Sequence, residues 1–206
     1  MKTLFITGIG TDVGKTVVSA IVTEALNADY WKPIQAGELA HSDAHKVEAL
    51  ISNKHSKIFE NSYALKTAMS PHAAAEIDGV TIETKKIIKP TTTNSLVIEG
   101  AGGLLVPIND SETILDLIKS DYKIIVVSKH YLGSINHTLL TIELLKNRGL
   151  VIAGIIFNGN EVKTSEAIIE KMTNVPLLGR INDEKIIDKA VVKKYATLLK
   201  PLLETL

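Results

Sequence analysis

The chain has 206 residues, with 23 lysines and arginines against 23 aspartates and glutamates, so its formal net charge is zero. This balance excludes a general electrostatic attraction to nucleic acid or to an anionic membrane. Apolar residues make up 45% of the chain and cysteine is absent, which predicts one well-filled domain over residues 1–206 and excludes disulfides, thiolate metal sites and thiol nucleophiles. Without a signal-peptide pattern or a run of 18 apolar residues, we expect a soluble cytoplasmic protein.

Short apolar, β-branched runs alternate with helical patterns along the chain. The expected strands lie over residues 4–7, 30–32, 96–99, 124–128, 153–158 and 176–179. The expected helices lie over residues 15–28, 43–52, 114–119, 135–147, 165–173 and 189–203. Nearly continuous apolar runs are typical of strands that are buried on both faces of a parallel sheet. The alternation predicts an α/β fold with a doubly wound, mostly parallel sheet.

Residues 54–93 interrupt this alternation. The segment is polar and contains Pro71 and Pro90, and residues 73–76 are good helix formers. We expect one or two helices to be inserted here between strands.

The first strand leads directly into a glycine-rich loop, Gly8-Ile9-Gly10-Thr11-Asp12-Val13-Gly14-Lys15-Thr16. A strand, such a loop and Gly-Lys-Thr at a helix start are typical of the phosphate-binding loop, in which the lysine contacts the β/γ-phosphates and the threonine hydroxyl binds Mg²⁺. Five residues separate Gly8 from Gly14 where the common form has four, so we expect a lengthened loop. The alternative is a simple turn at Gly14 followed by a solvated Lys15. The motif predicts a P-loop NTPase-like, three-layer α/β/α fold that binds ATP and Mg²⁺.

Charged residues stand at the ends of the next two expected strands. Glu99 ends one strand and precedes Gly100-Ala101-Gly102-Gly103. Because the carboxyl ends of parallel strands face the ligand crevice, Glu99 can reach phosphate-bound Mg²⁺, and Lys32 can face the charge that develops in phosphoryl transfer. Asp43 begins a helical pattern and could hold metal. The alternatives are a turn or cap at Glu99, a solvated Lys32 and a helix N-cap at Asp43.

Polar residues also follow the later strands. Gly133, Ser134 and Asn136 lie where a helix begins, and the free N–H groups there suit an anionic substrate group. Asn158 ends the fifth expected strand and could contact a nucleobase. The alternatives are an ordinary cap at Ser134 and a turn at Asn158. No histidine is a catalytic candidate.

This ordered set of motifs resembles the dethiobiotin synthetase family of ATP-dependent ligases. The matching segments are the loop 8–16, Lys32-Pro33-Ile34-Gln35, Ser42-Asp43-Ala44, Ser70-Pro71-His72, Glu99-Gly100-Ala101-Gly102-Gly103 with Pro107, and Leu132-Gly133-Ser134-Ile135-Asn136-His137. Their order and separations fit the family across residues 1 to about 160, and the resemblance fades from Arg180 onward. Ala36 departs from the family pattern, which usually has serine or threonine there.

The resemblance implies that 7,8-diaminopelargonate, CO₂ or bicarbonate and ATP are converted to dethiobiotin, ADP and phosphate through a carbamate and a carbamic-phosphoric anhydride. It implies Lys15, Lys32 and Thr11 as catalytic residues, and Thr16, Asp43 and Glu99 as Mg²⁺ ligands. The implied ATP contacts are Asp12, Val13, Gly14, Lys15, Thr16, Val17, Asp43, Glu99, Gly100, Ala101, Gly102 and Asn158. The implied substrate contacts are Lys32, Gly133, Ser134 and Asn136. It also implies a homodimer with the substrate at the interface, and no nucleic-acid or membrane partner.

The alternative is a partition-type P-loop ATPase that acts as a nucleotide-dependent switch. Such proteins resemble this architecture but carry a second lysine near the start of the loop, where this chain has Gly10. A net charge of zero also offers no general attraction to DNA. Both observations favour the ring-closing ligase.

Overall fold

The computed structural model describes residues 1–206. Its main sheet contains β1 (Thr3–Gly8), β2 (Asp29–Trp31), β4 (Ile58–Phe59), β6 (Leu96–Glu99), β7 (Lys123–Lys129), β8 (Val151–Asn158) and β9 (Leu177–Ile181). The strand order is β4-β2-β6-β1-β7-β8-β9, and every neighbouring pair is parallel. All six expected strands are present, and the predicted parallel sheet is confirmed.

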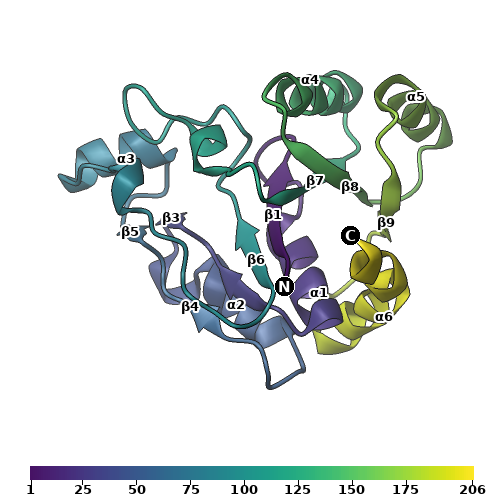
Figure 1. The fold of residues 1–206 in the computed structure, drawn as a ribbon, viewed down its shortest axis with the longest axis horizontal. Helices are drawn as coiled ribbons and strands as arrows, with labels where there is room; N and C mark the ends of the chain where they lie inside the picture. The colour runs from purple at the N-terminus through teal and green to yellow at the C-terminus, as the bar shows by residue number, and fades with distance from the viewer.

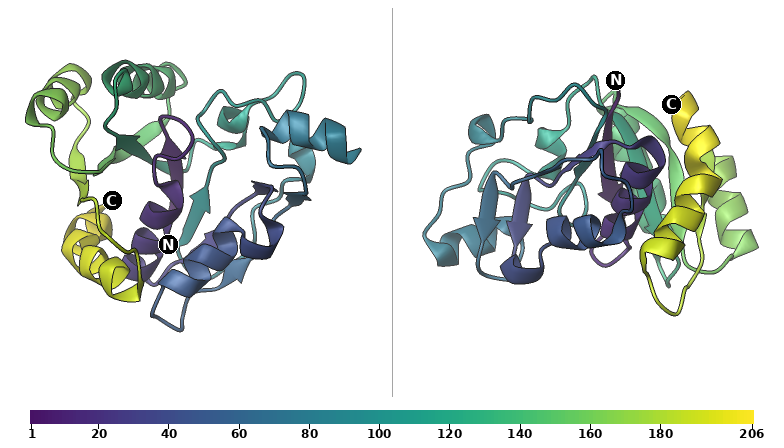
Figure 2. Two further views of the ribbon diagram at one scale, coloured as in Figure 1. Left: turned by 180° about the vertical axis from the view of Figure 1, so that it is seen from behind. Right: turned by 90° about the horizontal axis from the view of Figure 1, so that it is seen from below.

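Two layers of helices cover this sheet (Figures 1 and 2). On one face α1 (Lys15–Leu26) packs between α2 (Asp43–Leu50) and α6 (Lys189–Thr205). On the other face α4 (Ser134–Asn147) packs beside α5 (Lys163–Thr173). The predicted three-layer α/β/α arrangement is confirmed. None of these helices combines the length and apolarity needed to cross a membrane.

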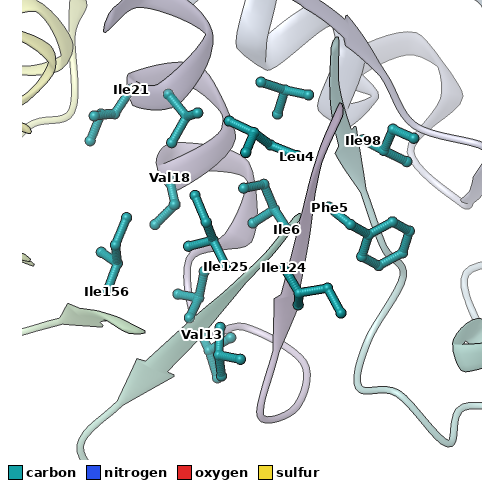
Figure 3. Packing of buried hydrophobic residues seen from close by; sticks show 14 of the residues in the cluster. Leu4, Phe5, Ile6, Val13, Val18, Ile21, Ile98, Ile124, Ile125 and Ile156 are labelled. Carbon is teal, nitrogen blue, oxygen red and sulfur yellow. The ribbon is translucent and has the colours of Figure 1, made fainter. Parts of the chain in front are cut away.

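The core around β1 follows the two-residue repeat of the strands. Phe5 is the register partner of Ile98 and Ile124, and these side chains share one face of the sheet. On the opposite face Ile6 packs with Val18 of α1 (Figure 3). These residues belong to one cluster of 47 buried hydrophobic side chains. Because β1 and α1 are both anchored in this cluster, the loop between them is held at the carboxyl edge of the sheet.

The segment 54–93 contains the expected helix, α3 (Pro71–Asp78), and also strands that the sequence patterns did not predict. One of them, β5 (Tyr63–Leu65), pairs in parallel with β3 (Ile34–Ala36) to form a separate two-stranded sheet, while β4 is the edge strand of the main sheet. Strands of two or three residues are too short for an alternating pattern to be recognised.

Three 3₁₀-helices complete the fold, η1 (Leu39–His41), η2 (Thr84–Lys86) and η3 (Ile114–Leu117). The last of these corrects the prediction of a helix over 114–119. Ile118 has an extended backbone, with φ −86° and ψ 123°, so the helix ends after a single turn.

Candidate active site

The glycine-rich loop joins β1 to α1 through two residues with left-handed backbone. Asp12 has φ 56° and Gly14 has φ 93°. Gly14 is also the N-cap of α1, and a Cβ atom there would collide with the side-chain amide of Asn158. Glycine is therefore required both for the backbone angle and for space. Lys15 is only 7% exposed and donates from Nζ to the Gly10 oxygen at 2.8 Å, so the solvated alternative for Lys15 is wrong.

Four charged or polar side chains from different elements meet beside this loop. Lys32, just after β2, donates from Nζ to Asp43 Oδ2 of α2 and to Glu99 Oε1 of β6, the latter at 3.3 Å. Thr16 of α1 donates from Oγ1 to the same Glu99 oxygen at 2.9 Å. Lys32 is 6% exposed and Glu99 is 1% exposed. The solvated alternative for Lys32 is therefore wrong.

The start of α2 explains how Asp43 reaches this cluster. Ser42, not Asp43, is the N-cap, and the Ser42 hydroxyl accepts a hydrogen bond from the His45 N–H. The N-cap alternative for Asp43 is therefore wrong. Gln35 accepts a hydrogen bond from the Asp43 N–H at 3.3 Å, which ties the first turn of α2 to β3. The Asp43 carboxylate is left to contact Lys32 and, at 3.4 Å, Lys46.

Burial and ion pairing oppose each other in this cluster. Burial by itself lowers the pKa of Lys32, but the carboxylates of Glu99 and Asp43 outweigh it and hold that pKa above its ordinary value. Burial likewise favours a raised pKa for Asp43, yet Lys32 brings the pKa of Asp43 below its ordinary value. Lys15 lacks an ion pair, and burial lowers its pKa to about 8 despite the charge of Glu99. At neutral pH both lysines are charged, and Lys15 is the closer to losing its proton.

The cluster and the loop line one cleft of 640 Å³. Ten predicted site residues lie in its wall, Thr11, Asp12, Gly14, Lys15, Thr16, Lys32, Asp43, Glu99, Ala101 and Gly102. The other lining residues are Ile34, Gln35, Ala36, Lys46, Ala68, Met69, Ser70, Pro71 and Val106. A cleft of this size is typical of sites for small ligands. Ala36, which has no hydroxyl, thus lines the cleft at a position where the family pattern usually has serine or threonine.

The remaining predicted residues do not line this cleft. Val13, Val17 and Gly100 lie next to lining residues in the chain, and Val13 is 2% exposed in the core. Asn158 contacts the loop instead, donating from Nδ2 to the Val13 oxygen at 2.9 Å. The last group, at the start of α4, consists of Gly133, Ser134 and Asn136.

The start of α4 differs in detail from the sequence expectation. Gly133, with φ 101°, is the N-cap of α4, so the alternative of an ordinary cap at Ser134 is wrong. Asn136 lines a different groove, between α4 and α5. Within one chain, the structure does not bring these residues together with Lys32.

Tyr30 and Lys46 are polar side chains of the site that the sequence motifs did not include. The Tyr30 hydroxyl donates to Glu99 Oε2 at 2.8 Å, and Lys46 lines the cleft beside Asp43. A signal for Tyr30 exists in the sequence, because alternate residues of a strand share a face and Tyr30 stands two positions before Lys32. Nothing comparable marks Lys46, which looks like a solvated lysine on a helix.

The oxygen donors of the cleft suit Mg²⁺. No group of three or more histidine, aspartate or glutamate side chains able to hold a metal occurs in the chain. Mg²⁺ bound with a nucleotide needs only one or two protein carboxylates, because phosphate oxygens and waters complete its octahedron. The Thr16 hydroxyl and the carboxylates of Glu99 and Asp43 form such a donor set.

Comparisons with known proteins identify the family. A family model described as an AAA domain matches residues 2–191. The ATP-dependent dethiobiotin synthetase BioD of Christiangramia forsetii is 62% identical over 195 residues, which cover 95% of this chain and 94% of that protein. The chain belongs to the dethiobiotin synthetase family. It is accordingly an ATP-dependent ligase of biotin biosynthesis.

A second relative agrees with this assignment, and two solved structures share the fold. The dethiobiotin synthetase of Cytophaga hutchinsonii is 52% identical over 201 residues, 97% of each chain, so the similarity continues beyond residue 180, where the motifs fade. MinD of Pyrococcus horikoshii, solved with Mg-ADP, has a TM-score of 0.58 at 18% identity and covers 97% of this chain and 89% of its own. A ParA family ATPase of Chlorobium tepidum has a TM-score of 0.53 at 12% identity, and the match covers 99% of this chain and 92% of that ATPase. These two likenesses show a shared P-loop NTPase fold and nothing about function.

Proposed function

We propose that this dethiobiotin synthetase joins CO₂ to 7,8-diaminopelargonate and closes the ureido ring of dethiobiotin, converting ATP to ADP and phosphate. The observation that carries the proposal is the Lys32 ammonium, which contacts Asp43 and Glu99 in a cleft bounded by the phosphate-binding loop. This places fixed cations and carboxylates around one small volume. A reaction between several anionic groups needs such preorganised charge.

The proposed reaction has three steps. One amine of the diamine attacks CO₂ and loses a proton, which gives a carbamate. A carbamate oxygen then attacks the γ-phosphorus of ATP, and ADP leaves. The neighbouring amine attacks the carbonyl carbon of this mixed anhydride, forms the second C–N bond, and displaces phosphate with loss of a proton. Ring closure needs mainly positioning, because the tethered amine has a high effective concentration.

The side chains of the cleft suit these steps. Lys15, at the first turn of α1, would pair with the β- and γ-phosphate oxygens, while the backbone N–H groups of residues 12–17 surround them. Lys32 would stabilise charge on the carbamate oxygen and on the transferred phosphoryl group. Thr11 lies in the cleft wall and would offer its hydroxyl to the carbamate.

Magnesium and nucleotide would share this site. Thr16, Asp43 and Glu99 would hold Mg²⁺, which supplies positive charge to the phosphate oxygens when bound. Gly100, Ala101 and Gly102 follow Glu99 at the carboxyl edge of the sheet, where small residues allow the nucleotide to approach the backbone closely.

In this proposal two copies of the chain, each a single domain over residues 1–206, complete the substrate site. Gly133, Ser134 and Asn136 would bind the substrate carboxylate from the second copy, because they do not line the cleft of their own chain. An exposed apolar pair next to them supports an interface, since Leu132 is fully exposed and Tyr131 is 43% exposed.

A phosphate-release assay tests the proposal. Purified protein is mixed with ATP, Mg²⁺ and bicarbonate, with and without 7,8-diaminopelargonate. Phosphate is expected only with the diamine, together with dethiobiotin detected by mass spectrometry. Phosphate release that is indifferent to the diamine would contradict the proposal and would favour a nucleotide-dependent switch.

A further inference from the structure

Tyr30 is a buried tyrosine of β2 whose hydroxyl contacts a proposed metal ligand. The side chain is 0% exposed, and its hydroxyl donates to Glu99 Oε2 at 2.8 Å. Because a phenol keeps its proton at neutral pH, Tyr30 is a hydrogen-bond donor to this carboxylate, with no access to solvent.

The two oxygens of Glu99 have different partners. Oε2 accepts from Tyr30, whereas Oε1 accepts from Thr16 Oγ1 at 2.9 Å and from Lys32 Nζ at 3.3 Å. Tyr30 lies opposite Val97 in the parallel pairing of β2 with β6. The sheet therefore fixes the backbone of Tyr30 relative to that of Glu99. This division of partners sets the plane of the carboxylate.

If the phenol oxygen of Tyr30 were removed, the Glu99 carboxylate would be free to rotate out of its present plane. Glu99 is 1% exposed, so water cannot readily replace the lost donor, and an unpaired buried oxygen is costly. The carboxylate would then relieve the cost by turning Oε2 towards the Lys32 ammonium. Such a rotation would move Oε1 away from Thr16.

We propose that Tyr30 is a positioning residue that orients Glu99 so that Oε1 faces Thr16 and the nucleotide-bound metal ion. The inference rests on the proposed function, in which Glu99 and Thr16 hold Mg²⁺. Groups that hydrogen-bond a metal-binding carboxylate change metal affinity by about 10- to 100-fold when they are removed. Tyr30 thereby acts on metal binding without touching metal, nucleotide or substrate.

The test is Tyr30→Phe, which removes one oxygen and keeps the ring in the core. Binding of Mn²⁺, a spectroscopic substitute for Mg²⁺, is measured by electron paramagnetic resonance in the presence of ADP. Binding of ADP in EDTA is measured by calorimetry, and a thermal melt verifies the fold. We expect Mn²⁺ affinity to fall by about 10-fold or more, with ADP binding in EDTA unchanged. Unchanged Mn²⁺ affinity, or an equal loss of ADP affinity in EDTA, would overturn the inference.

Two further variants separate this inference from the proposed function. Tyr122→Phe is the matched control and should change neither measurement. Tyr122 is 2% exposed and immediately precedes β7, at the amino-terminal end of the parallel strands, whereas Glu99 lies at the carboxyl end of β6. Glu99→Gln tests the metal ligand itself and should weaken Mn²⁺ binding at least as much as Tyr30→Phe. If Glu99→Gln binds Mn²⁺ normally, the metal role of Glu99 and the inference both fail. If only Tyr30→Phe binds Mn²⁺ normally, the inference alone fails.

Discussion

The side-chain amide of Asn158, at the end of β8, donates a hydrogen bond to the main-chain oxygen of Val13 in the phosphate-binding loop at 2.9 Å. The two residues are 145 positions apart in the chain. The bond ties the loop to a strand that lies two places from β1 in the sheet. The shape of the loop therefore depends on a side chain that is remote in sequence.

Asn158→Ala should weaken ADP binding by about fivefold, which corresponds to about 1 kcal/mol for one lost hydrogen bond. The Val13 oxygen would lose its donor, and the loop would no longer be held in one shape. Calorimetric titration with ADP measures the change. Asn160→Ala, at an exposed position two residues further on, is the control and should bind ADP normally. Equal affinities for all three proteins would show that the bond does not organise the loop.

Gly14→Ala should abolish nucleotide binding, because Gly14 has φ 93° and an added Cβ would displace the Asn158 amide. Gly79→Ala separates backbone strain from collision. Gly79 has φ 67° at the end of α3, and a Cβ there would meet no atom within 4 Å. This variant should lose about 1 kcal/mol of unfolding free energy and keep full ADP affinity. Normal ADP binding by Gly14→Ala would contradict the role of the loop geometry.

The affinity for ATP should fall as pH rises above about 8, the pKa to which burial lowers Lys15. Below this pH the ammonium is charged and attracts phosphate, and above it binding must also take up a proton. The loss can reach about tenfold per pH unit. Calorimetry across this range measures it, and Lys15→Arg, which keeps its charge, should flatten the dependence. An equally steep decline in Lys15→Arg would assign the effect to another group.

Lys15→Ala and Glu99→Ala should each lower the rate of diamine-dependent phosphate release by about 100-fold or more, because each removes fixed charge from the phosphoryl-transfer site. Circular dichroism should show an intact fold. Lys193→Ala, at an exposed position on α6, is the matched control and should remain fully active. Near-normal turnover in either site variant would refute the assigned roles.

Glu166 of α5 should stabilise the fold at neutral pH and not in acid. Burial favours a raised pKa for Glu166, but hydrogen bonds from Arg180, Val162 and His130 outweigh it and lower that pKa from 4.5 to about 2. Because the folded-state pKa lies below the unfolded value, this stability is fully present above about 4.5 and is lost as pH falls towards about 2.

Urea unfolding of Glu166→Gln measures this contribution. The difference in unfolding free energy from the unmodified protein should be largest at neutral pH and should shrink at about pH 3. Glu170→Gln, at an exposed position on the same helix, should show little difference at either pH. A difference for Glu166→Gln that is constant with pH would refute the ionic contribution.

Local sequence patterns account for the parts of the protein that depend on neighbouring residues. Apolar runs separated by helical patterns predict six of the seven strands of the main sheet and its two helical layers, because these patterns repeat over a few residues. The loop from Gly8 to Thr16 also indicates a phosphate site from sequence alone, because the preceding strand, the glycines and the start of the helix follow one another directly in the chain. The order of the motifs led to the family.

Contacts between side chains that are distant in sequence depend on how the strands pair in the folded protein. Lys32 and Glu99 are 67 positions apart, and their contact depends on the parallel pairing of β2 with β6. From sequence patterns alone, a solvated Lys32 was an open alternative and Tyr30 was not a candidate. The reason is that the sequences of β2 and β6 do not specify that these two strands are neighbours in the sheet. The β3–β5 sheet was missed for a related reason, since its three-residue strands are specified by their partners rather than by a local repeat.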